Sequence, residues 1–134
     1  MKLILPFVET MAIQSCNLSC VGCTNYSDLI HKGYVSWNSI ENDLKEWLEV
    51  IDIKDFGIMG GEPLLNPEIE QWIIGIRKLL PNSRIRFTTN GLKLHKNFHL
   101  VDLMHKLGNF SFKITVHKNT KELQKTINKI LNSY

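Results

Sequence analysis

Three cysteines lie in one short stretch, Cys16, Cys20 and Cys23, and the chain has no other cysteine. Three residues and then two separate them, a spacing that lets one loop wrap its sulfurs around a single centre without ligands from distant sequence. Structural metal sites and most iron-sulfur clusters are closed by four protein ligands. Three thiolates without a fourth therefore predict a metal centre with one position left for another molecule.

The cysteine count also bears on the compartment. An odd number of clustered cysteines indicates metal ligation in a reducing environment rather than disulfide bonds. Pro6 and Glu9 interrupt the apolar start of the chain, which argues against a secretory signal, and no apolar run is long enough to span a bilayer. We therefore expect a cytoplasmic protein without a membrane segment.

Two further motifs follow the cysteines in order. Gly60-Gly61-Glu62-Pro63 begins 37 residues after Cys23, and Thr88-Thr89-Asn90-Gly91 follows one predicted helix later. This ordered set resembles the radical S-adenosylmethionine (radical SAM) superfamily, and the resemblance covers residues 8 to about 117.

The resemblance implies both cofactors and a reaction. The three cysteines would hold a [4Fe-4S] cluster, whose fourth iron would be chelated by the amino and carboxylate groups of S-adenosylmethionine. Reductive cleavage of that cofactor would yield methionine and a 5′-deoxyadenosyl radical that abstracts hydrogen from an unknown substrate. It further implies that Gly60-Gly61-Glu62 contacts the methionine ammonium and that flavodoxin or ferredoxin supplies the electron.

The residue types suit these roles. Gly60 and Gly61 remove side chains where the backbone must approach a ligand. Glu62 offers a carboxylate for a charge-assisted bond to an ammonium, although a carboxylate at a helix entry would also be favoured by the helix dipole. By their position alone, four more polar residues are expected to contact the ribose or carboxylate of S-adenosylmethionine: Thr89, Asn90, Thr115 and His117. His117 can equally be interpreted as a surface histidine.

A zinc site is the alternative, with His31 completing a tetrahedral shell around the three thiolates. The seven residues between Cys23 and His31 exceed the usual zinc-ligand spacing, and zinc offers no reason for the Gly-Gly-Glu-Pro motif. The cluster is therefore the favoured interpretation.

Hydrophobic patterning predicts four strands that alternate with four helices. The expected strands are residues 7–14, 54–59, 84–89 and 110–117. Such alternation indicates parallel strands joined by right-handed crossovers, with catalytic groups at the strands' carboxyl ends. We therefore predict an α/β fold, a parallel (βα)4 open partial TIM-type barrel, in which residues 1–134 form a single truncated radical SAM core domain.

Capping residues delimit the helices. Ser36 and Thr120 are expected N-caps, and Asn66 followed by Pro67 predicts the start of the second helix. Pro81 stops that helix and Gly108 terminates the third. Two tryptophans of the first helix are interpreted as core rather than as cofactor stackers: Trp37 and Trp47.

Two departures from the family pattern stand out. Gly22 occupies the place before the third cysteine where an aromatic residue usually supports adenine, so another side chain such as Tyr26 would have to replace it. The family core also has six strand-helix units, against four predicted here. An open half-barrel cannot shield a radical from solvent, so we expect a second copy or another protein to cover it.

Charge is unevenly distributed along the chain. Residues 1–76 carry four Lys or Arg against eleven Asp or Glu, about −7, whereas residues 77–134 carry twelve against two, about +10. Without interleaved aromatic residues this basicity indicates a solvated surface more than nucleic-acid binding. Strand alternation places part of it on the open side of the sheet, as a cationic wall: Arg84, Arg86, Thr88, Lys113, Thr115 and His117.

Two alternative functions remain open at this point. Short members of the superfamily include activating proteins that generate a glycyl radical on a partner, although the Thr-Thr-Asn-Gly run and the residues after Cys23 look more like members that modify small molecules or peptides. The chain could also be a non-catalytic iron-sulfur module that works with a partner.

Overall fold

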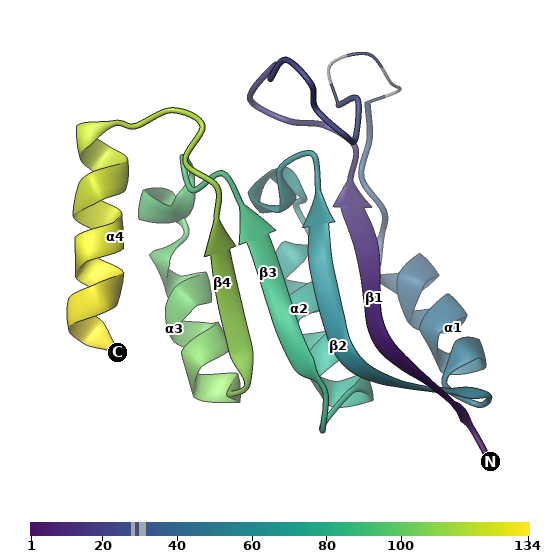
Figure 1. The fold of residues 1–134 in the computed structure, drawn as a ribbon. Coiled ribbons are helices and arrows are strands. Elements are labelled where there is room, and N and C mark those ends of the chain that lie inside the picture. Colours follow the sequence, from purple (N-terminus) through teal and green to yellow (C-terminus); the bar gives the residue numbers. More distant parts are fainter. Residues whose placement is uncertain (28, 30–31) are drawn as a thin grey trace.

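A computed structural model describes residues 1–27, 29 and 32–134, so His31, the fourth ligand of the alternative zinc site, lies outside the described residues. Four strands form one sheet in the order β1-β2-β3-β4, with every neighbouring pair parallel (Figure 1). The strands are β1 (Leu3–Ile13), β2 (Ile51–Gly60), β3 (Arg84–Thr89) and β4 (Phe110–Ile114). The helices are α1 (Trp37–Trp47), α2 (Ile69–Leu79), α3 (Phe98–Leu107) and α4 (Lys121–Ser133), with short 3-10 turns η1 (Pro63–Leu65) and η2 (Leu94–Lys96).

Helices α1, α2 and α3 cover one face of the sheet, and α4 stands beside its β4 edge (Figure 1). The described chain leaves the opposite face open, where Phe7 is 42% exposed and Met11 36%. The predicted α/β fold, an open partial TIM-type barrel of four parallel strands, is confirmed. No described helix has the length and apolar character needed to cross a membrane.

The hydrophobic core lies between the sheet and its helices. Strand side chains such as Phe56, Ile58 and Phe87 are fully buried there, facing Trp72 and Met104 from the helices. Burial of large side chains of this kind contributes about 1.5–3 kcal/mol each.

Only one of the two tryptophans predicted for this core belongs to it. Trp37 packs edge-on against Trp72 with ring centroids 6.1 Å apart, and its ring occupies the space beside Gly75. Trp47 is 54% exposed, so its prediction as a core residue was wrong. It is the last residue of α1, just before the chain turns into β2.

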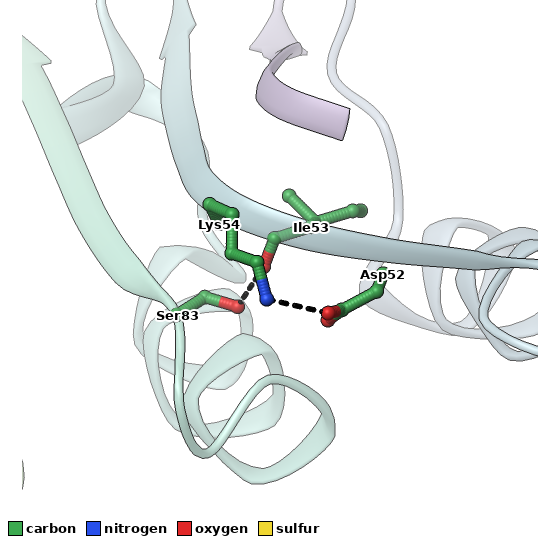
Figure 2. A network of polar contacts seen from close by, with 4 residues as sticks. All are labelled: Asp52, Ile53, Lys54 and Ser83. Carbon is green, nitrogen blue, oxygen red and sulfur yellow. Dashed lines mark hydrogen bonds and ion pairs between the residues drawn. The ribbon is translucent and has the colours of Figure 1, made fainter. Parts of the chain in front are cut away.

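Strands β1 and β2 are longer than predicted because they pair with each other beyond the start of β3. Their register begins at Leu3 with Ile51, whereas β2 meets β3 only from Asp55 with Arg84. Ser83, just before β3, donates its hydroxyl to the Ile53 carbonyl at 2.5 Å and so continues the contact (Figure 2). The same view shows Lys54 paired with Asp52 at 2.6 Å.

Strand β4 is shorter than the predicted residues 110–117. It ends at Ile114 because its partner β3 ends at the opposite residue, Thr89, and one further backbone bond joins Thr115 N–H to the Thr89 carbonyl. Phe112 faces the helices as expected and packs against Phe87. Val116 lies beyond the last paired residue of this strand and is 46% exposed.

The helix starts follow the expected caps, with one offset. Ser36 accepts from Ser39 N–H at 3.3 Å, and Thr120 accepts from Leu123 N–H at 3.1 Å. Helix α2 begins two residues later than the predicted start at Pro67. Asn66 caps the intervening turn, accepting from Glu68 N–H at 2.8 Å, while its amide donates to two carbonyls of the β1 side: Ala12 and Val35.

Candidate cofactor site

The carboxyl ends of β2, β3 and β4 and the loop that follows β1 line a cavity of about 300 Å³. All three cysteines line it, and the loop that carries them rises above the end of β1 (Figure 1). Other walls come from the strand ends and the segment after β4, including Gly60, Gly61, Thr88, Thr89, Asn90, Lys113, Thr115 and His117. The tertiary structure thus brings together nine of the ten predicted site residues. Glu62, the tenth, lies behind this wall.

The base of the cysteine loop is closed by backbone hydrogen bonds. The returning chain pairs antiparallel with the end of β1, as Gln14 N–H donates to the Gly33 carbonyl and Val35 N–H to the Ala12 carbonyl. Because the backbone groups at this buried strand end are hydrogen-bonded, the strand end provides a stable support for the loop. The loop therefore begins from a fixed position directly before Cys16.

The Gly60-Gly61 pair lets the end of β2 pass against this base. Gly61 N–H donates to the Ile13 carbonyl at 2.8 Å, and the next residue, Glu62, donates from its backbone to the Ser15 carbonyl at 2.9 Å. A Cβ atom on Gly61 would lie 2.1 Å from the Ser15 oxygen, and one on Gly60 would lie 2.2 Å from the Ile13 oxygen. These glycines therefore serve a close approach of two backbones, besides lining the cavity.

Two asparagines that the sequence analysis did not single out anchor the loop. Asn25 donates its side-chain amide to the Gly60 carbonyl at 2.9 Å, and Asn17 accepts from the amide of Asn90 at 2.7 Å. Both lie within or just after the cysteine motif, and this position is the sequence feature from which their role could have been predicted. Asparagine is common in loops for this reason, since its side chain bonds readily to backbone groups.

The carboxylate of Glu62 is fully buried and accepts three hydrogen bonds from within the chain. Thr89 hydroxyl donates at 2.6 Å, Asn90 N–H at 2.8 Å and Leu64 N–H at 3.1 Å. Burial raises the pKa of Glu62 above its usual value of 4.5, and the three hydrogen bonds oppose that rise. A carboxylate has about four acceptor positions, so one remains for a further donor.

The raised pKa of Glu62 leads to a prediction for Thr89→Val. A carboxyl whose pKa is higher in the folded state binds protons more strongly there, so its stabilising effect is complete below pH 4.5 and is lost as pH rises through the folded pKa. Removing the Thr89 hydroxyl takes away a bond that favours the charged form, which raises that pKa further. We expect the free energy of unfolding to fall by about 1–3 kcal/mol at pH 8, and by less at pH 4.

Urea denaturation of the apoprotein at both pH values tests this, with Thr115→Val, directly after β4, as the matched control. An equal loss at pH 4 and pH 8 would show that Thr89 contributes only packing and its bond to Gly91 N–H.

The thiols themselves lie in two different environments. Burial raises the pKa of the Cys16 thiol, and the negative charges of Glu62 and Cys20 add to the effect. Backbone amides of Ser27 and Asn25 lower the pKa of the Cys23 thiol, which favours the thiolate form that binds metal. The loop thus contains one thiol prepared for ligation and one that a positive metal centre would have to ionise.

The donor set fits an iron-sulfur cluster. Among the described residues, no three His, Cys, Asp or Glu side chains gather closely enough to hold a single metal ion, yet the three cysteines face one cavity. Each thiolate of a cubane cluster binds a different iron, so the sulfurs need to share a space and not one point. Ser27 also lines the cavity, and its buried hydroxyl lies beside Cys23.

The remaining predicted residues differ in position. Thr115 and His117 line the cavity from the segment after β4, where His117 is exposed. Tyr26, considered as a support for adenine, is 60% exposed and lies outside the residues that line the cavity.

The predicted cationic wall is partly neutralised within the chain. Arg84 forms an ion pair with Asp55, and the guanidinium of Arg86 lies 5.1 Å from the ring centre of Phe7. Lys113 is exposed at the cavity. Arg84 is therefore paired with a carboxylate, whereas the contact of Arg86 with Phe7 leaves its positive charge in place.

The fold and this edge define an α/β half-barrel with a cysteine loop over the carboxyl ends of its strands. The sequence matches the radical SAM superfamily over residues 12–133, and the chain belongs to that superfamily. Members use a [4Fe-4S] cluster and S-adenosylmethionine, so the predicted cofactors are those of the family. No curated protein matches the chain.

Two similar solved structures support the fold. One is a crystal structure of BtrN in complex with AdoMet and 2-DOIA, with a TM-score of 0.72 and 20% identity. The match covers 100% of this chain and 53% of the BtrN chain. The other is SeMet BtrN in an open conformation, with a TM-score of 0.66 and 21% identity, covering 91% of this chain and 55% of that one. The chain thus spans about half the length of these structures.

Proposed function

We propose that this chain provides the cofactor-binding core of a radical SAM enzyme that abstracts hydrogen from its substrate. The observation that carries the proposal is that Cys16, Cys20 and Cys23 line one cavity together with the glycine backbone at the end of β2. A loop with three soft thiolates suits iron, and the lack of a fourth cysteine leaves one iron for a chelating ligand.

In this proposal each cavity wall has its own task. The three cysteines hold the [4Fe-4S] cluster, and the strand ends hold S-adenosylmethionine beside it. Once bound, the two cofactors supply a one-electron reductive cleavage that releases methionine and a 5′-deoxyadenosyl radical. Gly60 and Gly61 present backbone to the methionine part, because no side chain intervenes there.

The polar residues complete the binding site for the cofactor. Glu62 offers its fourth acceptor position to the methionine ammonium, which requires the cavity wall to open locally, because the carboxylate is buried. Thr89 and Asn90 on β3, with Thr115 and His117 after β4, provide contacts for the ribose and the carboxylate.

The proposed reaction requires an electron donor and a cover for the open face of the sheet. Flavodoxin or ferredoxin is the proposed electron donor, and a second copy or another protein is proposed to cover the uncovered strands, because a carbon radical must be kept from water. Residues 1–134 are proposed to act as one core domain, since the four strands share one sheet and one hydrophobic core.

Cleavage of S-adenosylmethionine tests the function. We expect the anaerobically reconstituted and reduced protein to form 5′-deoxyadenosine and methionine in equal amounts, because one cofactor molecule yields one of each. Chromatography of the quenched reaction measures both products. Cys20→Ala, reconstituted in parallel, should form neither product.

The other outcomes separate the alternatives. A protein that carries the cluster and binds the cofactor but never cleaves it would be a non-catalytic iron-sulfur module. Cleavage that begins only with a partner whose backbone then bears a glycyl radical, visible by electron paramagnetic resonance, would identify an activating protein.

A further inference from the structure

Asn90 connects the buried end of β3 to the first cysteine. Its side-chain nitrogen donates to the Asn17 side-chain oxygen at 2.7 Å and lies 3.9 Å from the sulfur of Cys16, more than seventy residues away in sequence. Asn90 is 7% exposed and Asn17 is exposed, so these contacts are shielded from water on the Asn90 side. A polar contact in such a place is stronger than one at the surface.

The orientation of this amide is set by its other contacts. The side-chain oxygen of Asn90 accepts from Leu92 N–H at 3.0 Å, which leaves the nitrogen to point toward the cysteine loop. The backbone N–H of Asn90 donates to Glu62 at 2.8 Å, and the same carboxylate accepts from Thr89. The backbone of Asn90 is therefore fixed, and its side-chain donor cannot turn away from Cys16 without breaking the hydrogen bonds to Leu92 N–H and Asn17.

The second loop anchor offers a natural comparison. Asn25 also donates its amide at 2.9 Å, but its acceptor is the backbone carbonyl of Gly60. Both asparagines fix the loop to a strand end. Asn90 differs because its donor also lies within reach of a sulfur that is proposed to bind iron.

We propose that Asn90 is a positioning residue that orients Cys16 toward the cavity and donates a hydrogen bond to its sulfur when it is a thiolate. This inference rests on the proposed cluster. Hydrogen bonds to cluster sulfurs withdraw negative charge and raise the reduction potential, so Asn90 makes the bound cluster easier to reduce. The cofactor contact expected for Asn90 is a separate role.

A matched pair of variants tests the proposal. Asn90→Leu and Asn25→Leu each remove one loop anchor without adding charge, and Asn90→Asp keeps the acceptor for Leu92 N–H while removing the donor. The measurements are iron per chain and the midpoint potential of the reconstituted cluster, from a redox titration followed by electron paramagnetic resonance.

We expect both Asn90 variants to show a ratio of reduced to oxidised cluster about tenfold smaller at the original midpoint potential, equivalent to a shift of about 59 mV for one electron. Asn25→Leu should keep the original potential. Loss of iron from both Asn90 variants but not from Asn25→Leu would also support positioning of Cys16.

Three results would overturn the inference. These are an unchanged potential in the Asn90 variants at full iron content, the same shift in Asn25→Leu, and equal iron loss in all three variants. Failure of the unaltered protein to take up a cluster would instead refute the proposed function, so the two failures are distinguishable.

Discussion

Replacing Cys16, Cys20 or Cys23 by alanine is expected to abolish stable iron binding, whereas we expect the unaltered protein to bind about four irons per chain after anaerobic reconstitution. The effect should be nearly complete for each single variant. The loop contains three thiolates and the chain has no other cysteine, so no spare ligand is available to replace the one removed. Iron analysis and the visible absorbance of the cluster measure the result.

A matched control lies within the same loop. Ser19 is exposed and directly precedes Cys20, so Ser19→Ala changes the loop without touching a ligand and should retain the full iron content. Stoichiometric zinc without iron-dependent absorbance, and with unchanged binding in Cys20→Ala, would contradict the cluster assignment and favour a different metal site.

Gly61→Ala is expected to lower the free energy of unfolding by at least about 3 kcal/mol, or to prevent folding altogether. The added Cβ would lie 2.1 Å from the Ser15 carbonyl oxygen and 2.7 Å from that of Gln14. Both are backbone atoms at the hydrogen-bonded base of the cysteine loop, so neither can move aside as a flexible side chain would. Denaturant unfolding of the apoprotein measures the loss.

Two other glycines calibrate this effect. Gly33→Ala, on the returning side of the same loop, meets only the Gln14 side-chain oxygen at 4.0 Å and should change stability by no more than about 0.5 kcal/mol. Gly22 has a φ of +73° with open space around it, so Gly22→Ala should cost about 1–2 kcal/mol from backbone strain alone. Similar losses in all three variants would show that the close approach at Gly61 is not the cause.

The alternation of strands and helices was determined by local sequence. Apolar periodicity, the caps Ser36 and Thr120 and the stop at Gly108 each depend on residues a few positions apart, and the structure has all of them. Once four strands alternate with helices, a parallel sheet with its loops at one edge follows from chain geometry. This is why the cavity walls could be named from motifs at strand ends.

The lengths of the strands were decided by tertiary pairing. Pairing with β1 extends β2 back to Ile51, and β4 stops at Ile114 because β3 has ended opposite it. Val116 continues the alternating pattern and still lies exposed, because no neighbouring strand remains to hold it under the helices. A sequence pattern carries no information about where a partner strand ends.

The candidate site shows the same division between sequence and structure. The sequence by itself indicated which groups are candidates for the chemistry, since three clustered thiols and Gly-Gly-Glu-Pro are recognisable without a fold. Only the tertiary structure decided that Glu62 is buried under three hydrogen bonds and that Asn90 reaches the sulfur of Cys16. The bond from Thr89 to Glu62 spans 27 positions of sequence, and the contact from Asn90 to Cys16 spans 74. Residues so far apart in sequence come into contact only when the strand ends meet at one edge of the sheet.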